Sequence, residues 1–204
     1  MRLPSTRQML LAVPVILLSA GCGLSPRKDP TVFLVLAPGA AEVVIPMIAR
    51  TDLHIGVGPV TLPRYLDRPQ LVTRVDATEL TVHEFARWSA PLGALVADAI
   101  GENLMNYLAA GSVRTHPWAA ADRPNVSVRI AIRQFEPVAP DSAVLRARWE
   151  VVDADGQPIG EPQASHHRTA AAVGPKAEAL ALSRLIGLLA ADIAGVVRSV
   201  NVTR

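Results

Sequence analysis

Histidine and carboxylate pairs are the residues in this sequence whose types and spacing come closest to metal chemistry. His83 and Glu84 begin the spacing of a zinc-protease helix, in which a second histidine follows the first by four residues. Arg87 occupies that position, so the second ligand is missing. His166 and His167 are adjacent in a strand-like stretch, where successive side chains point to opposite faces. We therefore expect no metal site, and one solvated histidine next to a packed one.

Motifs for nucleophilic catalysis and nucleotide binding are also missing. No Gly-x-Ser-x-Gly pattern occurs in the sequence. The run Gly56-Val57-Gly58-Pro59 is too short for a dinucleotide loop and no helix follows it. Asp153 and Asp155-Gly156 fit a β-turn, because the distal glutamate of a calcium loop is absent. These observations predict a protein without catalytic residues, metal or cofactor.

Cys22, the single cysteine among 204 residues, is the residue whose context predicts a specific modification. Arg2 and Arg7 precede an apolar run from Met9 to Leu18, and the small residues 19–21 follow it. This is the order of a secretory signal peptide, and the run is too short to span a membrane. A cysteine directly after such a cleavage zone predicts a bacterial lipoprotein, whose thiol and new amine carry acyl chains. The alternative is an ordinary secretory peptide that leaves an unmodified thiol.

Cleavage of the signal peptide, residues 1–21, leaves 183 residues, which suffice for one domain with a substantial core. The 18 remaining basic residues balance the 18 acidic ones, because both signal arginines are lost. Such a neutral domain has no basic patch for nucleic acid, so its membrane attachment must come from the acyl chains on Cys22. We expect residues 22–30 to be a short tether and residues 31–204 a single domain close to the bilayer.

Hydrophobic periodicity predicts an α+β fold: a mixed, mostly antiparallel sheet with two long helices packed on one face, in the order strands, helix, strands, helix. Ser89 is the expected N-cap of the first helix and Gly111 suits its C-terminal end. Charges such as Arg184 and Asp192 interrupt the apolar runs, so neither helix is expected to span a membrane. The expected strands are 31–37, 53–60, a hairpin of 70–75 and 79–84, 112–116, and an antiparallel meander from 126 to 171; the expected helices are 89–108 and 174–200.

The proline-flanked segment from Pro63 to Pro69 is the best candidate for an interaction surface. Prolines stiffen it, so Tyr65 and Leu66 could be presented to a partner with little loss of entropy. The alternative is that Tyr65 and Leu66 fold back to cap the core. Asp67 and Arg68 are expected to form an ion pair in a turn rather than to act as catalysts. Trp118, in a polar loop, is a further candidate contact. The candidate interaction residues are Pro63, Arg64, Tyr65, Leu66, Asp67, Arg68 and Trp88.

Residues 57–92 carry a pattern that resembles a known family. Gly58-Pro59-Val60 leads into an unbroken run from Leu62 to Arg74, and Glu84, Arg87-Trp88 and Pro91-Leu92 follow a polar turn. In this pattern the chain resembles the ABC-type transport auxiliary lipoproteins, also described as PqiC-like or YmbA-like lipoproteins. The resemblance covers most of the mature chain in element order and is most specific over residues 55–108.

The resemblance implies a non-enzymatic lipoprotein that palmitate-type acyl chains anchor in the outer membrane, facing the periplasm, and that self-associates into a ring. Its implied partners are an MCE-domain protein and an ABC transporter, which together move lipids between the two membranes. Gly23 after the cysteine agrees with export to the outer membrane. The alternative function is an outer-membrane assembly or envelope-integrity lipoprotein that binds proteins without lipid transport. A lipid-anchored hydrolase would need a triad or a metal set.

Overall fold

The computed structural model describes residues 28–41 and 49–200. Cys22, the signal peptide and most of the expected tether lie outside these ranges. The described elements, in chain order, are β1 (Val32–Leu34), β2 (His54–Thr61), β3 (Gln70–Arg74), β4 (Leu80–Trp88), α1 (Leu92–Leu108), β5 (Ser112–Thr115), the 3-10 turn η1 (Ala120–Asp122), β6 (Val126–Val138), β7 (Ser142–Asp153), β8 (Gln163–Ala170) and α2 (Pro175–Val197).

The described residues form a mixed sheet of eight strands and two α-helices, which is the predicted α+β class. The longest strand, β6, is the centre of the sheet. β7 pairs with β6 over its whole length, whereas β2 pairs with residues 126–131 and β3 with Val138. One path through the sheet therefore runs β1-β4-β3-β6-β2-β5, and β7 and β8 extend it beyond β6.

Antiparallel ladders confirm the predicted hairpin of β3 with β4 and the predicted meander of β6, β7 and β8. The parallel pairs β1–β4, β2–β5, β2–β6 and β3–β6 were not predicted. Among the described strands the antiparallel ladders join more residue pairs than the parallel ones, which agrees with the prediction of a mostly antiparallel sheet. The parallel pairs escaped prediction because parallel strands are joined by distant crossovers that leave no local turn motif.

Helix α1 begins and ends at residues other than those expected. Pro91, rather than Ser89, is its N-cap residue. Ser89 instead donates its backbone N–H to the carbonyl of Leu34 at 2.9 Å, because it continues the pairing of β4 with β1. At the other end, Ala109 adopts a left-handed conformation with φ of 41° and closes the helix before Gly111.

Helix α2 begins at Pro175 directly after Gly174, as predicted. It is the one described helix that is long and apolar enough to cross a membrane. Its apolar side chains are instead buried against α1 and against β6, β7 and β8, which makes it a core helix. Those that are at most 1% exposed include Leu182, Leu185, Ile186, Leu189 and Ile193.

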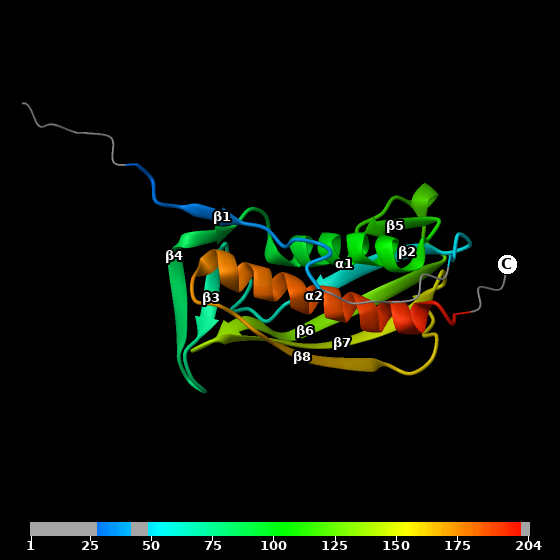
Figure 1. Ribbon diagram of the computed structural model, residues 1–204. Helices are drawn as coiled ribbons and strands as arrows, with labels where there is room; N and C mark the ends of the chain where they lie inside the picture. The colour runs from blue at the N-terminus through cyan, green and yellow to red at the C-terminus, as the bar shows by residue number, and fades with distance from the viewer. Residues whose placement is uncertain (1–27, 42–48, 201–204) are drawn as a thin grey trace, which may run out of the picture.

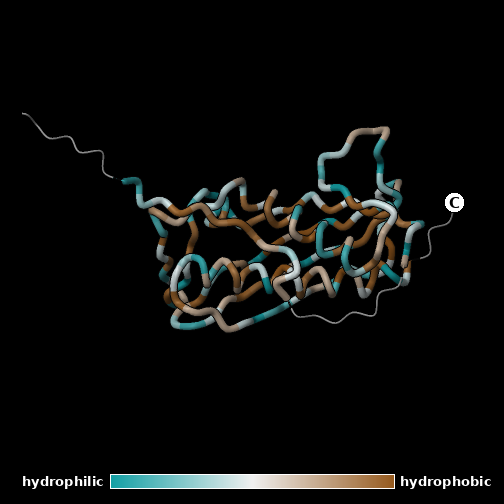
Figure 2. Tube along the Cα trace, turned by 45° about the horizontal axis from the view of Figure 1, so that its top comes forward, coloured by the Kyte–Doolittle hydropathy of each residue, from teal (hydrophilic) through white to brown (hydrophobic). Residues whose placement is uncertain are grey.

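After β1 the chain crosses the two helices, which lie side by side (Figure 1). Ala37 donates its backbone N–H to Ser183 Oγ at 3.0 Å, and Gly39 donates its own to Asn103 Oδ1 at 3.0 Å. Both helix side chains are about 1% exposed. Buried polar groups therefore tie this crossing to the core. Figure 2 shows hydrophobic segments along the strands and helices through the length of the molecule.

Helix α1 connects two distant ends of the molecule. It starts just after β4, beside β1, and it ends just before β5 (Figure 1). A helix of 17 residues is about 25 Å long. The chain enters the described structure at the β1 end, so the β5 end lies about one helix length from the point where the tether arrives.

Candidate functional site

The predicted interaction segment from Pro63 to Pro69 joins β2 to β3 and is fastened at both ends. Leu66 donates its N–H to the Pro63 carbonyl at 2.9 Å, and Trp88 donates its N–H to the Pro69 carbonyl at 2.7 Å. Leu66 is 3% exposed and Tyr65 is half-buried, so these side chains fold back on the core. This is the second of the two alternatives that the sequence left open. The exposed charged side chains of the segment are Arg64, Asp67 and Arg68.

Glu136, a fully buried carboxylate on β6, holds the segment in place. Tyr65 donates its hydroxyl to Oε2 at 2.7 Å, and Arg74 Nε forms an ion pair with Oε1 at 2.7 Å. Gln134 and the backbone N–H of Phe135 donate two further hydrogen bonds, at 2.9 and 3.1 Å. A buried charge is tolerated only with such a complete set of partners. The cluster therefore joins the segment to β3 and β6.

The ionisation of this cluster suits a structural joint. Burial, with the hydrogen bond to Glu136, raises the pKa of Tyr65 to about 12. The hydrogen bond with Glu136 raises the pKa of Arg74 as well. Tyr65 thus remains a hydrogen-bond donor at neutral pH, far from the pKa that a general base would need.

Three predicted residues, Asp67, Arg68 and Trp88, line one pocket of about 370 Å³. Trp88 is 5% exposed, so its indole forms the wall of the pocket and does not project from the surface. Within the described structure no ion pair joins Asp67 to Arg68, and the predicted turn ion pair is wrong. The backbone N–H of Arg68 donates to the Leu66 carbonyl at 2.8 Å, which shapes the turn without side-chain pairing. The role of these residues in partner binding stays a prediction.

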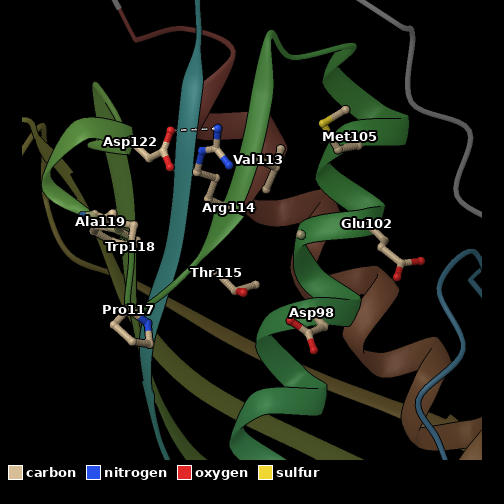
Figure 3. Close-up of a pocket in the computed structure, with 11 residues that line it drawn as sticks. Asp98, Glu102, Met105, Val113, Arg114, Thr115, Pro117, Trp118, Ala119 and Asp122 are labelled. Carbon is tan, nitrogen blue, oxygen red and sulfur yellow. Dashed lines mark ion pairs between the residues drawn. The ribbon is translucent and has the colours of Figure 1, made fainter.

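A larger groove of about 560 Å³ lies at the β5 end of α1 (Figure 3). One wall is the exposed face of α1, and the other is β5 with the loop that follows it. The α1 wall contributes Asp98, Glu102 and Met105, and the facing wall contributes Arg114, Thr115, Pro117, Trp118 and Asp122.

Trp118 is positioned in this groove by close packing against β2. A methyl group on Gly56 would lie 2.8 Å from the Trp118 ring and 2.7 Å from Pro124, so only glycine permits this approach. The ring of His116 meets the indole edge-on, with 5.1 Å between the ring centroids. These contacts hold the indole as a wall of the groove.

The charge of the groove is predominantly acidic. Arg114 forms an ion pair with Asp122 at 3.1 Å, drawn as a dashed line in Figure 3. Asp98 and Glu102 are exposed one helical turn apart, and no ion pair within the described residues neutralises either. Like charges at this spacing repel each other, so a bound cation would be stabilised. The groove therefore suits a peptide segment that offers a lysine or arginine, with an apolar side chain against Trp118.

Sequence reasoning found only part of this groove. It selected Trp118 as a contact, but it did not single out Asp98 and Glu102. Their four-residue spacing was the available indication. The sequence contained no indication of the pairing between Arg114 and Asp122, because this pairing depends on how the loop after β5 folds back.

Ser165, His167 and Asp192 lie close together without forming a catalytic triad. Asp192 Oδ2 accepts a hydrogen bond from Ser165 Oγ at 2.5 Å and contacts His167 Nε2 at 2.7 Å. The carboxylate therefore stands between serine and histidine, whereas in a triad the histidine is the central residue. His166 is exposed beside the half-buried His167, as the strand pattern predicted. The cluster joins β8 to α2.

Comparison with known proteins points to one family. Residues 34–194 match the model of the ABC-type transport auxiliary lipoprotein component. No curated protein sequence matches the chain. A solved structure of an uncharacterised protein is 18% identical with a TM-score of 0.65, and the match covers 82% of this chain and 98% of that chain. A protein from Xanthomonas campestris is 14% identical with a TM-score of 0.67, over 82% of this chain and 94% of that chain. At these identities the likeness shows a shared fold.

Proposed function

Because this chain belongs to the family of ABC-type transport auxiliary lipoprotein components, we propose that it docks the periplasmic conduit of an MCE/ABC-type lipid transport system at the outer membrane. In this proposal the protein is non-enzymatic, acyl chains on Cys22 anchor it, and the domain faces the periplasm. Its partners are an MCE-domain protein, the associated ABC transporter and further copies of itself.

One structural observation carries the proposal. The acidic groove lies at the β5 end of α1, and the tether enters at the β1 end (Figure 1). A domain held to a bilayer by its β1 end presents the groove away from that bilayer. A partner that reaches the domain across the periplasm would meet this groove first.

The large groove at the β5 end suits docking more than carriage of lipid. A site for acyl chains is predominantly apolar. The apolar faces of α1 and α2 are buried in the core, and the large groove contains three carboxylates. We therefore assign the transported lipid to the partner conduit.

Site-specific photo-crosslinking in membranes tests this function. Ala119, exposed in the groove wall, is replaced by a photoreactive phenylalanine analogue in the full chain, and Ala164, exposed on β8, is the matched control. We expect an MCE-domain protein to be captured from position 119 and not from position 164. Capture of that protein from neither position contradicts the docking proposal. Capture of an outer-membrane assembly protein at position 119 supports the alternative function in envelope integrity.

Charge reversal tests the chemistry of the groove. Asp98→Lys combined with Glu102→Lys replaces two exposed carboxylates by cations, so a basic partner segment would be repelled. We expect capture at position 119 to fall about tenfold or more, since each close charge pair contributes on the order of 1.5 kcal/mol or more. Glu161→Lys, at an exposed position of the loop before β8, is the control and should leave capture unchanged. Equal capture by all variants would show that charge does not select the partner.

A further inference from the structure

Three apolar side chains are exposed together at the β1 end, and we call them the β1 patch: Phe33 (68% exposed), Val35 (59%) and Phe85 (59%). The chain has three phenylalanines, and the third, Phe135, is 1% exposed. Large aromatic side chains are normally buried, and apolar side chains that gather on a surface mark a contact site. The patch lies where β1 and β4 pair.

The register of β1 with β4 places the whole patch on one face. Leu34 pairs with Trp88, and both are buried. Phe33 pairs with Arg87, and successive side chains of a strand alternate between its two faces, so these two side chains lie on the face that points away from the core. Phe85 lies two residues before Arg87 on β4 and points the same way. Val35 directly follows β1, and it is exposed between the buried Leu34 and Leu36. The patch is therefore a continuous strip across two neighbouring strands.

We infer that the β1 patch inserts into the bilayer that holds the acylated Cys22 and forms a second membrane contact of the domain. This inference rests on the proposed acyl anchor. Val32, where β1 begins, follows Cys22 by ten residues, and ten extended residues span at most about 35 Å. The patch is thus the first folded surface that the tether brings to the bilayer. Apolar side chains strengthen a membrane attachment that acyl chains begin.

The charges around the patch indicate how this contact is stabilised. Lys28 and Arg87 are basic, and Asp29 and Glu84 are acidic, so the local charge balances. Attraction to anionic headgroups is therefore weak, and insertion of apolar side chains must carry the contact. An apolar contact is insensitive to salt, whereas an exposed ionic contact weakens with it.

A second copy of the chain is the competing occupant of the patch. In the described structure β1 pairs with β4 alone, so its outer edge is open to another strand. The tether favours the bilayer, because each copy carries its own anchor at this end and insertion needs no second molecule. Proximity through a short linker raises the effective concentration of the tethered surface.

Quenching by brominated lipids tests the inference. The full acylated chain carrying Phe33→Trp or Phe85→Trp is reconstituted into phosphatidylethanolamine and phosphatidylglycerol vesicles, with or without bromine on the acyl chains. The matched control is Val75→Trp, at an exposed valine (40%) at the other end of the β3–β4 hairpin. The three native tryptophans give the same background in every variant. We expect brominated vesicles to quench most of the fluorescence of the tryptophan introduced at position 33 or 85. The fluorescence of the tryptophan introduced at position 75 should persist. Added salt should change neither result.

Each outcome distinguishes the patch from the anchor. If the chain floats with the vesicles but the tryptophans at positions 33 and 85 stay unquenched, the patch inference is overturned and the anchor stands. If the chain does not float with the vesicles, the anchor and the patch inference fall together. Crosslinks between copies at position 33 without quenching would assign the patch to a second copy. Equal quenching at position 75 would indicate nonspecific adsorption.

Discussion

At the scale of single residues, Glu136 explains why the predicted interaction segment is not free. The sequence suggests Tyr65 as an interface anchor, but its hydroxyl donates to a carboxylate 71 positions further along the chain. That carboxylate is fully buried, so each of its partners is needed to stabilise the charge. The exposed residues Arg64, Asp67 and Arg68 remain available for contacts.

Tyr65→Phe removes the donor and should lower the free energy of unfolding by about 1.5–3 kcal/mol, the range for hydrogen bonds to charged groups. The folded-state pKa of Tyr65, about 12, lies above its ordinary value of about 10. This stabilisation is therefore complete below pH 10 and is lost as the pH rises toward 12. Urea unfolding between pH 8 and pH 12 should show the difference between the two proteins shrinking over that range.

Tyr107→Phe is the control, because the Tyr107 hydroxyl has only a 3.5 Å contact with the neutral carbonyl of Gly187. At pH 8, Tyr107→Phe should lower the free energy of unfolding clearly less than Tyr65→Phe does. Equal losses for the two tyrosine variants would contradict the role assigned to Glu136.

At the scale of elements, β2 connects the acidic groove to the core. It pairs in parallel with β5 and β6, and its register with β6 shifts between Val57 and Val60. Gly58 lies in this irregular stretch with φ of +111°, a backbone conformation that favours glycine. Gly56 provides the space for the Trp118 ring. Packing at Gly56 and backbone conformation at Gly58 therefore account for the two glycines that the sequence presents as an incomplete nucleotide loop.

Gly56→Ala should force Trp118 and Pro124 to shift and cost about 1–3 kcal/mol, as overpacking does. We expect it to reduce partner capture at position 119 as well, because the groove wall moves. Urea unfolding measures the first effect and photo-crosslinking the second. Gly195→Ala on α2 is the contrasting control. A methyl group there meets nothing within 4 Å, so stability should rise by about 0.4–1 kcal/mol. A Gly56→Ala protein as stable as wild type would refute the close packing of Trp118.

At the scale of the whole molecule, the proposed function depends on two separated ends. The β1 end carries the tether and the β1 patch, and the β5 end carries the acidic groove (Figure 1). The mature chain is formally neutral. Anchor and patch together would hold the β1 end down and leave the groove facing the periplasm.

Cys22→Ser tests the anchor at this scale. The variant should leave the membrane fraction for the soluble periplasmic fraction with its fold intact, since a few inserted side chains bind only marginally without acyl chains. Fractionation with circular dichroism of the released chain measures both properties. Ser25→Ala, in the expected tether, should stay with the membrane. A Cys22→Ser chain that remains membrane-bound in cells without the transport partners would show that acylation is not the anchor.

The sequence by itself determined the α+β class, both helices, the β3–β4 hairpin and the β6-β7-β8 meander. It also pointed to the family. These predictions succeeded because each depends on periodicity, turn residues or a motif within a short stretch. The start of α1 was wrong because a strand pairing involving Ser89 competed with capping.

Only the tertiary structure decided the four parallel strand pairs, the burial of Tyr65 and Leu66 and the assembly of the groove. Each of these joins residues far apart in the chain, and no local pattern records which distant side chain fills a given space. The charge on Glu136 could be read from the sequence, but its burial and its partners depend on how β3, β6 and the segment between β2 and β3 pack together.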